Sequence, residues 1–445
     1  MIKYDSLDKH KLSRSHRKFK PKTQSEFESV VIFGDSLSDF GNLSTLIYLG
    51  SSGQFWFPPS PPLLSPNPIP PDIFNPFGGS YYSKAPYYNS VKNWEKRHQP
   101  ILSPSGIIIP FTPNDPPQVS ASNGPIWVDF LPKALGLSPN QVSNYAYAGA
   151  TTGFTNGLQP FLPSPLNTPL PLPGLLTEIK SFTDNTVKAD PKALYVVWAG
   201  ANDGFNLAGY LANNPPSSFQ VAFSTIISTV ETAVKNITFA ITSLADKGAH
   251  TFLVPNLPDL GKTPLLSQNQ QSAFIGKAFS ILFDVALEFT LPKLERSLHI
   301  DIVKPDVYSL AEDVFKRPQE YGFKNVTEPL ITQNPLNPDV KPEDFFWYDY
   351  QHPTTQGHAL IAEFFQESLF ASSHGMYGAN GNLSQFLGSE LAKDALELAG
   401  DLFQQGIGSS DFKSFINDLS GLLPPDKSFL SLCSSDLNLL ANDRW

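Results

Sequence analysis

Short apolar runs alternate with longer amphipathic stretches over most of the chain, and the two patterns predict different elements. Apolar runs that stop at glycine or at polar residues are typical of buried strands. We expect strands within residues 29–34, 143–153, 193–203, 250–259 and 299–306. Apolar residues that recur every three or four positions predict helices within residues 124–137, 175–187, 219–248, 268–296 and 354–370. Strands that alternate with helices indicate an α/β fold, in which helices cover both faces of a parallel sheet.

Proline and leucine patterns set off other parts of the chain. Residues 54–118 and 160–174 are rich in proline, which fixes φ and removes a hydrogen-bond donor, so both are expected to be loops with polyproline II character. We assign residues 29–372 to the main domain and treat residues 54–118 as an insert in it. Leucine recurs every three or four positions within residues 373–445, which predicts a helical C-terminal extension. Docking of this extension on the main domain is expected; partner or membrane binding is the alternative, and its acidic polar face disfavours the membrane.

The charge of the chain is unevenly distributed. Residues 1–24 hold eight Lys and Arg against two Asp, a net charge of +6, which leaves −16 of the total of −10 on the rest. This acidic body argues against nucleic-acid binding. Residues 1–28 are expected to be a basic, disordered tail in solvent; contact with an anionic surface, such as a membrane, or with the acidic body of the protein itself is the alternative.

Cysteine usage and hydropathy bear on the compartment. Cys433 is the only cysteine, so a disulfide within the chain and a cysteine-based metal site are both excluded. The first 28 residues lack the apolar segment of a signal peptide, and no stretch approaches the length of a transmembrane helix. We therefore expect a cytoplasmic protein, or one exported by a route that needs no signal peptide.

Four strand ends carry residues that an acyl-transfer site needs, and such ends face one crevice in an open parallel sheet. Ser36 follows the first strand, where a serine can act as a nucleophile or merely cap a helix. Gly149 would let the backbone approach a ligand, and Asn202 could donate its amide to an oxyanion. A turn glycine and a capping asparagine are the alternatives.

The fourth predicted strand end carries Asp349 and His352. Their spacing lets the carboxylate orient the imidazole within one loop, which leaves the other ring nitrogen free for a serine. Pro353 is expected to start the next helix, and His358 is expected to be an ordinary residue of that helix.

The four blocks GDSLSDFGN, NYAYAGATT, GAND and DYQHPT resemble the marker blocks of the GDSL esterases/lipases, which belong to the SGNH hydrolase superfamily. The connecting stretches are similar to those of the lipase-like branch of this family. The resemblance implies a flavodoxin-like, three-layer α/β/α fold with Ser36 as nucleophile, His352 as base and Asp349 as the acid that orients the base. It also implies an oxyanion hole made by the N–H groups of Ser36 and Gly149 and the side chain of Asn202.

These residues predict a serine ester hydrolase that works through an acyl-enzyme on Ser36, without a metal or a cofactor. Lipid or other acyl esters, phospholipids included, are the expected substrates if apolar side chains of the proline-rich loops line an acyl groove; the alternative is that they only pack the loops down. The candidates are Phe55, Trp56, Phe57, Leu63, Leu64, Phe161, Leu162, Leu166, Leu170 and Leu172. A carbohydrate O-acetyl esterase and an acyltransferase are further alternatives. A non-enzymatic binding protein on the same scaffold is disfavoured, because such a relic should have lost at least one of the five site residues.

Overall fold

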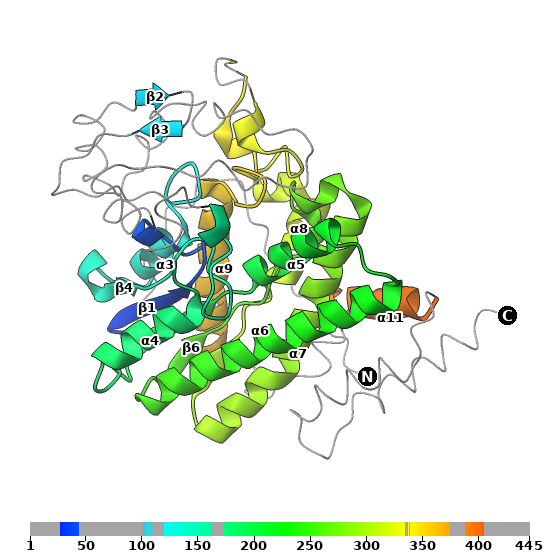
Figure 1. The fold of residues 1–445 in the computed structure, drawn as a ribbon. Coiled ribbons are helices and arrows are strands. Elements are labelled where there is room, and N and C mark those ends of the chain that lie inside the picture. The colour runs from blue at the N-terminus through cyan, green and yellow to red at the C-terminus, as the bar shows by residue number, and fades with distance from the viewer. Residues whose placement is uncertain are drawn as a thin grey trace, which may run out of the picture.

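A five-stranded parallel sheet forms the centre of the molecule, in the order β4-β1-β5-β6-β7 (Figure 1). Its strands are β1 (Ser29–Gly34), β4 (Val142–Asn144), β5 (Ala193–Trp198), β6 (Thr251–Leu253) and β7 (Asp301–Val303). A separate antiparallel pair consists of β2 (Ile101–Ser103) and β3 (Gly106–Ile108). This computed structural model describes residues 27–43, 101–103, 106–108, 120–161, 172–333, 337, 339–373 and 388–404. The α/β fold with a parallel sheet is confirmed.

The apolar run of β1 faces two cores at once. Val31 and Phe33 lie in one buried cluster, and Val30 and Ile32 lie in a second cluster on the other face of the sheet. Successive strand residues point to opposite faces, so a strand that is covered on both sides must be apolar at every position. This is why β1 and β5 read as continuous apolar runs rather than as alternating patterns.

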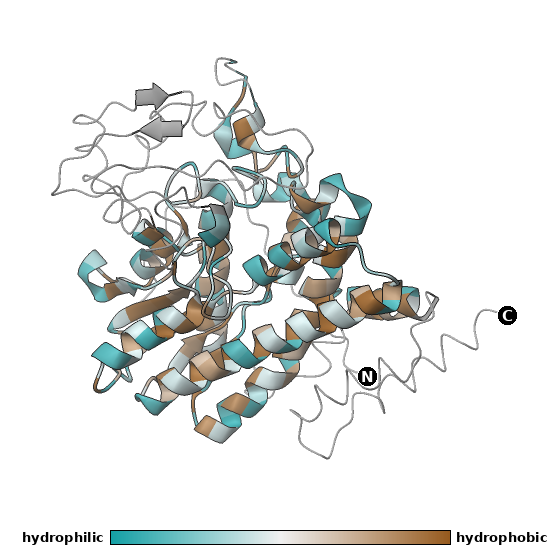
Figure 2. Ribbon diagram, in the orientation of Figure 1, coloured by the Kyte–Doolittle hydropathy of each residue, from teal (hydrophilic) through white to brown (hydrophobic). Residues whose placement is uncertain are grey.

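Two layers of helices cover the sheet, with their apolar sides turned toward it (Figure 2). Residues of α4 (Leu175–Asn185), α5 (Ala201–Asn213), α6 (Phe219–Asp246) and α7 (Gln270–Leu298) contribute to the first core. Residues of α3 (Trp127–Ala134) and α9 (Thr355–Ser373) contribute to the second. The helix α8 (Val307–Lys316) follows β7 at the carboxyl edge of the sheet. The expected three-layer arrangement is therefore present.

The helix α11 (Glu390–Gln404) belongs to the predicted C-terminal extension and packs on α7 and α8. Leu391, Leu398 and Leu402 are buried there, and the hydroxyl of Tyr308 on α8 donates to Asp394 Oδ2 at 2.7 Å. Within the predicted extension, α11 therefore packs against the main body of the protein. The predictions for the basic tail up to residue 26, for most of the insert and for residues 405–445 lie outside the described residues.

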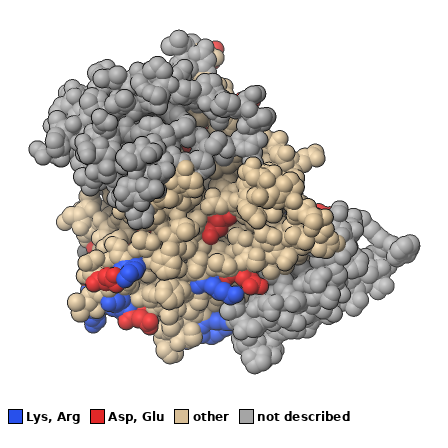
Figure 3. Space-filling view, in the orientation of Figure 1, with Lys and Arg blue, Asp and Glu red and all other residues tan. Residues whose placement is uncertain are grey.

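Charged side chains are sparse on the face shown in Figure 3, and several stand beside a group of opposite sign. Lys180 pairs with Asp184 on α4, and Lys235 pairs with Glu231 on α6. Among the helices that the structure describes, none has the length and apolar character needed to cross a membrane.

Candidate active site

The turn after β1 presents Ser36 at the carboxyl edge of the sheet. A Cβ at Gly34 would lie 2.3 Å from the carbonyl oxygen of Trp198, so only glycine lets the ends of β1 and β5 approach this closely. Beyond it, the N–H groups of Ser38 and Asp39 both donate to the carbonyl of Asp35 at 2.9 Å. This tight turn leaves Ser36 partly exposed next to the buried Asp35.

Ser36, His352 and Asp349 form one hydrogen-bonded chain. The distance from His352 Nε2 to Ser36 Oγ is 2.7 Å, and His352 Nδ1 lies 2.7 and 2.9 Å from the two carboxylate oxygens of Asp349. Asp349 Oδ1 also accepts from the backbone N–H groups of Gln351 and His352, which fixes the carboxylate in its own loop. The three residues that sequence reasoning singled out as a triad therefore meet in space.

The loop that carries Asp349 and His352 corrects two predictions. It does not follow a strand: the residues around it form only isolated bridges, between Phe345 and Asn325 and between Trp347 and Pro353, and α9 comes next. Pro353 also does not begin the helix, which starts at Thr355. Pro353 is held in the bridge to Trp347 and so stays outside the helix. The hydroxyl of Thr355, the first residue of α9, donates to the carbonyl oxygen of Pro125.

The surroundings of His352 favour its protonated form. Burial lowers the pKa of His352, but the negative charges of Asp349 and Asp35 raise it, and the net shift is upward from 6.5. A carboxylate that holds the Nδ1 proton leaves Nε2 as the acceptor that faces the serine.

Gly149 and Asn202 reach the same region from β4 and β5. Gly149 has φ of +80°, and a Cβ there would lie 2.4 Å from Asn156 Oδ1, so the position requires glycine. Asn202 lies in the first turn of α5 and lines the same pocket as Ser36, while its amide donates one hydrogen to Ala150 O at 3.0 Å. Among the described residues, neither the N–H of Ser36 nor that of Gly149 has an acceptor.

Buried carboxyl groups surround these residues, and sequence reasoning missed them. Burial raises the pKa of Asp35 to about 7 and that of Asp203 to about 6. Asp203 accepts from both the N–H and the hydroxyl of Thr152 at 2.8 Å, which ties α5 to the loop that holds Gly149. The sequence did offer a signal for these two acids: Asp35 directly precedes Ser36, and Asp203 directly follows Asn202.

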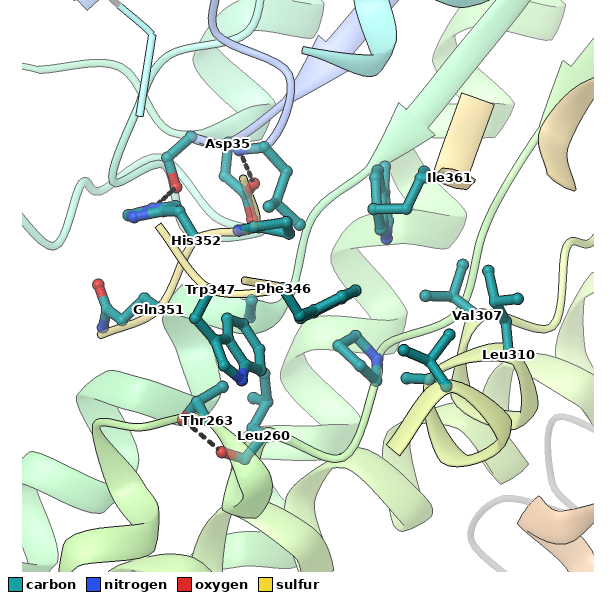
Figure 4. A pocket seen from close by; sticks show the side chains of 18 of the residues that line it. Asp35, Leu260, Thr263, Val307, Leu310, Phe346, Trp347, Gln351, His352 and Ile361 are labelled. Carbon is teal, nitrogen blue, oxygen red and sulfur yellow. Dashed lines mark hydrogen bonds between the residues drawn. The ribbon is translucent and has the colours of Figure 1, made fainter. Parts of the chain in front are cut away.

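An apolar pocket opens beside Ser36 and His352 (Figure 4). In this view His352 and Asp35 lie at one side, Val307 and Leu310 lie at the other, and Phe346 lies between them. Its apolar walls come from the end of β5, from α5, the loop after β6, α8, the loop before His352 and α9. They include Trp198, Phe205, Pro258, Leu260, Val307, Leu310, Ala311, Val314, Phe315, Phe346, Trp347, Leu360 and Ile361.

Of the residues that the sequence suggested for substrate binding, only Leu172 has a described side chain, and it is not among these walls. Leu172 is buried in a separate small cluster with Leu43, which is packing rather than a groove. The remaining candidates, Phe55, Trp56, Phe57, Leu63, Leu64, Leu162, Leu166, Leu170 and the side chain of Phe161, lie outside the described residues. Among the residues that are described, no three His, Cys, Asp or Glu side chains are grouped so that they could hold a metal ion.

The family model for GDSL-like Lipase/Acylhydrolase matches residues 30–365, and the chain belongs to this family. It is similar to a GDSL esterase/lipase of Arabidopsis thaliana, with 25% identity over 67% of this chain and 70% of that protein. An acetylesterase of Thermothelomyces thermophilus is 26% identical over 56% of this chain and 75% of that protein.

Two further relatives are matched over a smaller share of their length. An uncharacterized protein from the trpE-trpG intergenic region of Pseudomonas putida is 24% identical over 76% of this chain, which spans 48% of that protein. The thermolabile hemolysin of Vibrio parahaemolyticus is 23% identical over 56% of this chain and 55% of that protein. The chain thus spans about half the length of these two relatives.

Proposed function

We propose that the protein is a carboxylic ester hydrolase that forms an acyl-enzyme on Ser36. The observation that carries this proposal is the continuous chain from Ser36 Oγ through His352 to Asp349, with both links at 2.7 Å. Such a chain activates a hydroxyl that is otherwise a weak nucleophile at neutral pH. The names of the relatives, an esterase/lipase and an acetylesterase, agree with ester hydrolysis in general.

The reaction then proceeds in two halves. Ser36 Oγ attacks the ester carbonyl carbon while His352 Nε2 takes its proton, and the resulting oxyanion accepts from the N–H groups of Ser36 and Gly149 and from Asn202. Collapse breaks the bond to the alcohol, which leaves with the proton from His352. Water attacks the acyl-enzyme with the same base and releases the acid. Asp349 keeps the imidazole in the tautomer that accepts at Nε2.

The apolar pocket beside Ser36 favours an ester with a hydrocarbon acyl chain, such as a lipid. Its walls between Ser36 and α8 are almost entirely aliphatic or aromatic, and burial of each methylene there contributes about 0.8 kcal/mol. An O-acetyl group would leave this surface without a partner. We further propose residues 29–372 as the hydrolase domain, with α11 as the docked part of the extension.

A labelling experiment and an ester series test the proposal. A fluorophosphonate probe should label Ser36 in the native protein and should leave Ser36→Ala unlabelled at an unchanged Tm. Hydrolysis of p-nitrophenyl acetate, butyrate, octanoate and palmitate, beside a phospholipid and an acetylated sugar, then reports the substrate class. If Ser36→Ala retains full turnover, the serine mechanism is wrong. If only the acetylated sugar is cleaved, the acyl-chain assignment is wrong.

A further inference from the structure

Three of four consecutive backbone N–H groups in the loop after β4 have an acceptor. That of Tyr147 donates to Glu178 Oε1 at 3.1 Å, and that of Ala148 donates to Asp39 Oδ2 at 2.8 Å. That of Ala150 donates to the carbonyl of Tyr147 at 3.0 Å. The N–H of Gly149, which lies between them, has no acceptor among the described residues. The bonds on either side leave this one donor available to a ligand.

The carboxylate of Asp39 also binds the chain that follows Ser36. Its oxygens accept from the N–H groups of Gly41, Asn42 and Leu43 at 2.7, 2.6 and 3.1 Å, in addition to the bond from Ala148. Asp39 is 2% exposed, so water does not compete for these bonds. One carboxylate therefore joins the turn that carries the nucleophile to the loop that carries Gly149.

Glu178 makes a second bridge of the same kind from α4. Its Oε2 accepts from the N–H of Gly34 at 2.9 Å, at the end of β1, and its Oε1 accepts from Tyr147. Glu178 is 1% exposed. A shift of the Gly149 loop would remove a hydrogen-bond donor from a buried carboxyl group at each bridge, which is costly when no water can replace it.

We propose that Asp39 and Glu178 are positioning residues, which hold the N–H of Gly149 at a fixed place relative to Ser36. Neither acid touches the substrate in this proposal; each acts through the backbone that it binds. The inference rests on the proposed function, because a fixed donor at Gly149 matters only if an oxyanion forms on an ester bound at Ser36. Donors that are fixed before the reaction need no reorganisation when the charge develops.

Asp39→Asn tests the proposal directly. Asparagine has one acceptor oxygen and an amide that cannot accept, so the loop after Ser36 and Ala148 can no longer both be held. We expect kcat on an ester that the native protein cleaves to fall by about 10- to 100-fold, as a misplacement of the order of 1 Å can cause. KM should stay within about twofold, because the donor acts mainly on the transition state. The inhibition constant of a trifluoromethyl ketone, which mimics the oxyanion, should rise by the same factor.

Two more variants separate positioning from general loss of stability. Glu178→Gln should change kcat and the inhibition constant in the same directions, and it decides the question alone if Asp39→Asn does not fold. Asp284→Asn is the matched control, since Asp284 is also buried and also accepts a backbone N–H, that of Leu257 at 2.9 Å. It should leave kcat and the inhibition constant unchanged.

Each remaining outcome points to a specific failure. If Asp39→Asn and Glu178→Gln fold and keep the native kcat, the positioning role is wrong. If their inhibition constants stay constant while kcat falls, the acids do not act on the oxyanion, and the inference also fails. A native protein that cleaves no ester and takes no fluorophosphonate would instead refute the proposed function.

Discussion

His358 should make the fold sensitive to acid, independently of any effect on catalysis. It lies on α9 and is fully buried, and neither of its ring nitrogens has a hydrogen-bond partner among the residues that the structure describes. Burial and the nearby charge of His352 lower the pKa of His358 from 6.5 to about 3. The unfolded chain therefore binds a proton at this site between about pH 6.5 and pH 3, and the folded chain does not.

The sign and size of the effect follow from this difference. The stabilisation from a neutral His358 is complete above about pH 6.5 and is lost as the pH falls toward about 3. Each unit of pH below 6.5 costs about 1.4 kcal/mol in the free energy of unfolding, or about 2.7 kcal/mol at pH 4.5. At about 2 cal/mol/K of unfolding entropy per residue, a domain of roughly 340 residues should lose about 4 °C in Tm.

A variant isolates this contribution from those of other groups. His358→Leu has a similar volume and suits the apolar surroundings, but it cannot take up a proton. Buried acids such as Asp35 and Asp203, whose pKa values are raised, act in the opposite direction as the pH falls. They are the same in both proteins, so the difference in Tm between variant and native protein reports His358.

The assay is calorimetry of the native protein and His358→Leu at pH 7.5 and pH 4.5. The variant should lose about 4 °C less than the native protein between the two values. His299→Asn is the control, because His299 is exposed at the C-terminal end of α7 and asparagine tolerates its left-handed φ of 55°. Equal pH dependence in native protein and His358→Leu would show that the buried ring accepts a charge at no cost, contrary to this reasoning.

Three further predictions concern the site itself. Asp349→Asn should move the acid limb of kcat/KM to lower pH, because Asp349 raises the pKa of His352, whose neutral form is the base; an unmoved limb would count against the pair. Asn202→Ala should lower kcat by roughly 10²- to 10³-fold with little change in KM, and a change in KM alone would exclude an oxyanion role. Ala311→Leu should fill the apolar pocket and cut kcat/KM for octanoate esters by about fourfold for each displaced methylene, with acetate esters unaffected. If kcat/KM falls by the same factor for octanoate and acetate esters, Ala311 contributes only to packing and does not contact the acyl chain.

The order of strands and helices could be predicted from the sequence because both signals are local. A strand buried on both faces must be apolar throughout, as in residues 29–34, and a long surface helix must repeat its apolar residues, as in residues 219–248. The members of the triad could also be named, since Asp349 and His352 share one loop and Ser36 sits directly after a strand. Their meeting at 2.7 Å was visible only in the folded chain.

The pocket and the carboxylate bridges combine residues that are distant in the sequence, so only the tertiary structure determined them. The apolar pocket takes Phe205, Val314 and Ile361 from three different helices, and nothing in those helices separates a pocket wall from ordinary core. The bridges from Asp39 to Ala148 and from Glu178 to Gly34 span more than a hundred residues each. Local sequence specifies which face of its own helix or strand a side chain lies on. The residue that it contacts on another element depends on how the layers of the fold pack together, and that packing is a property of the whole chain.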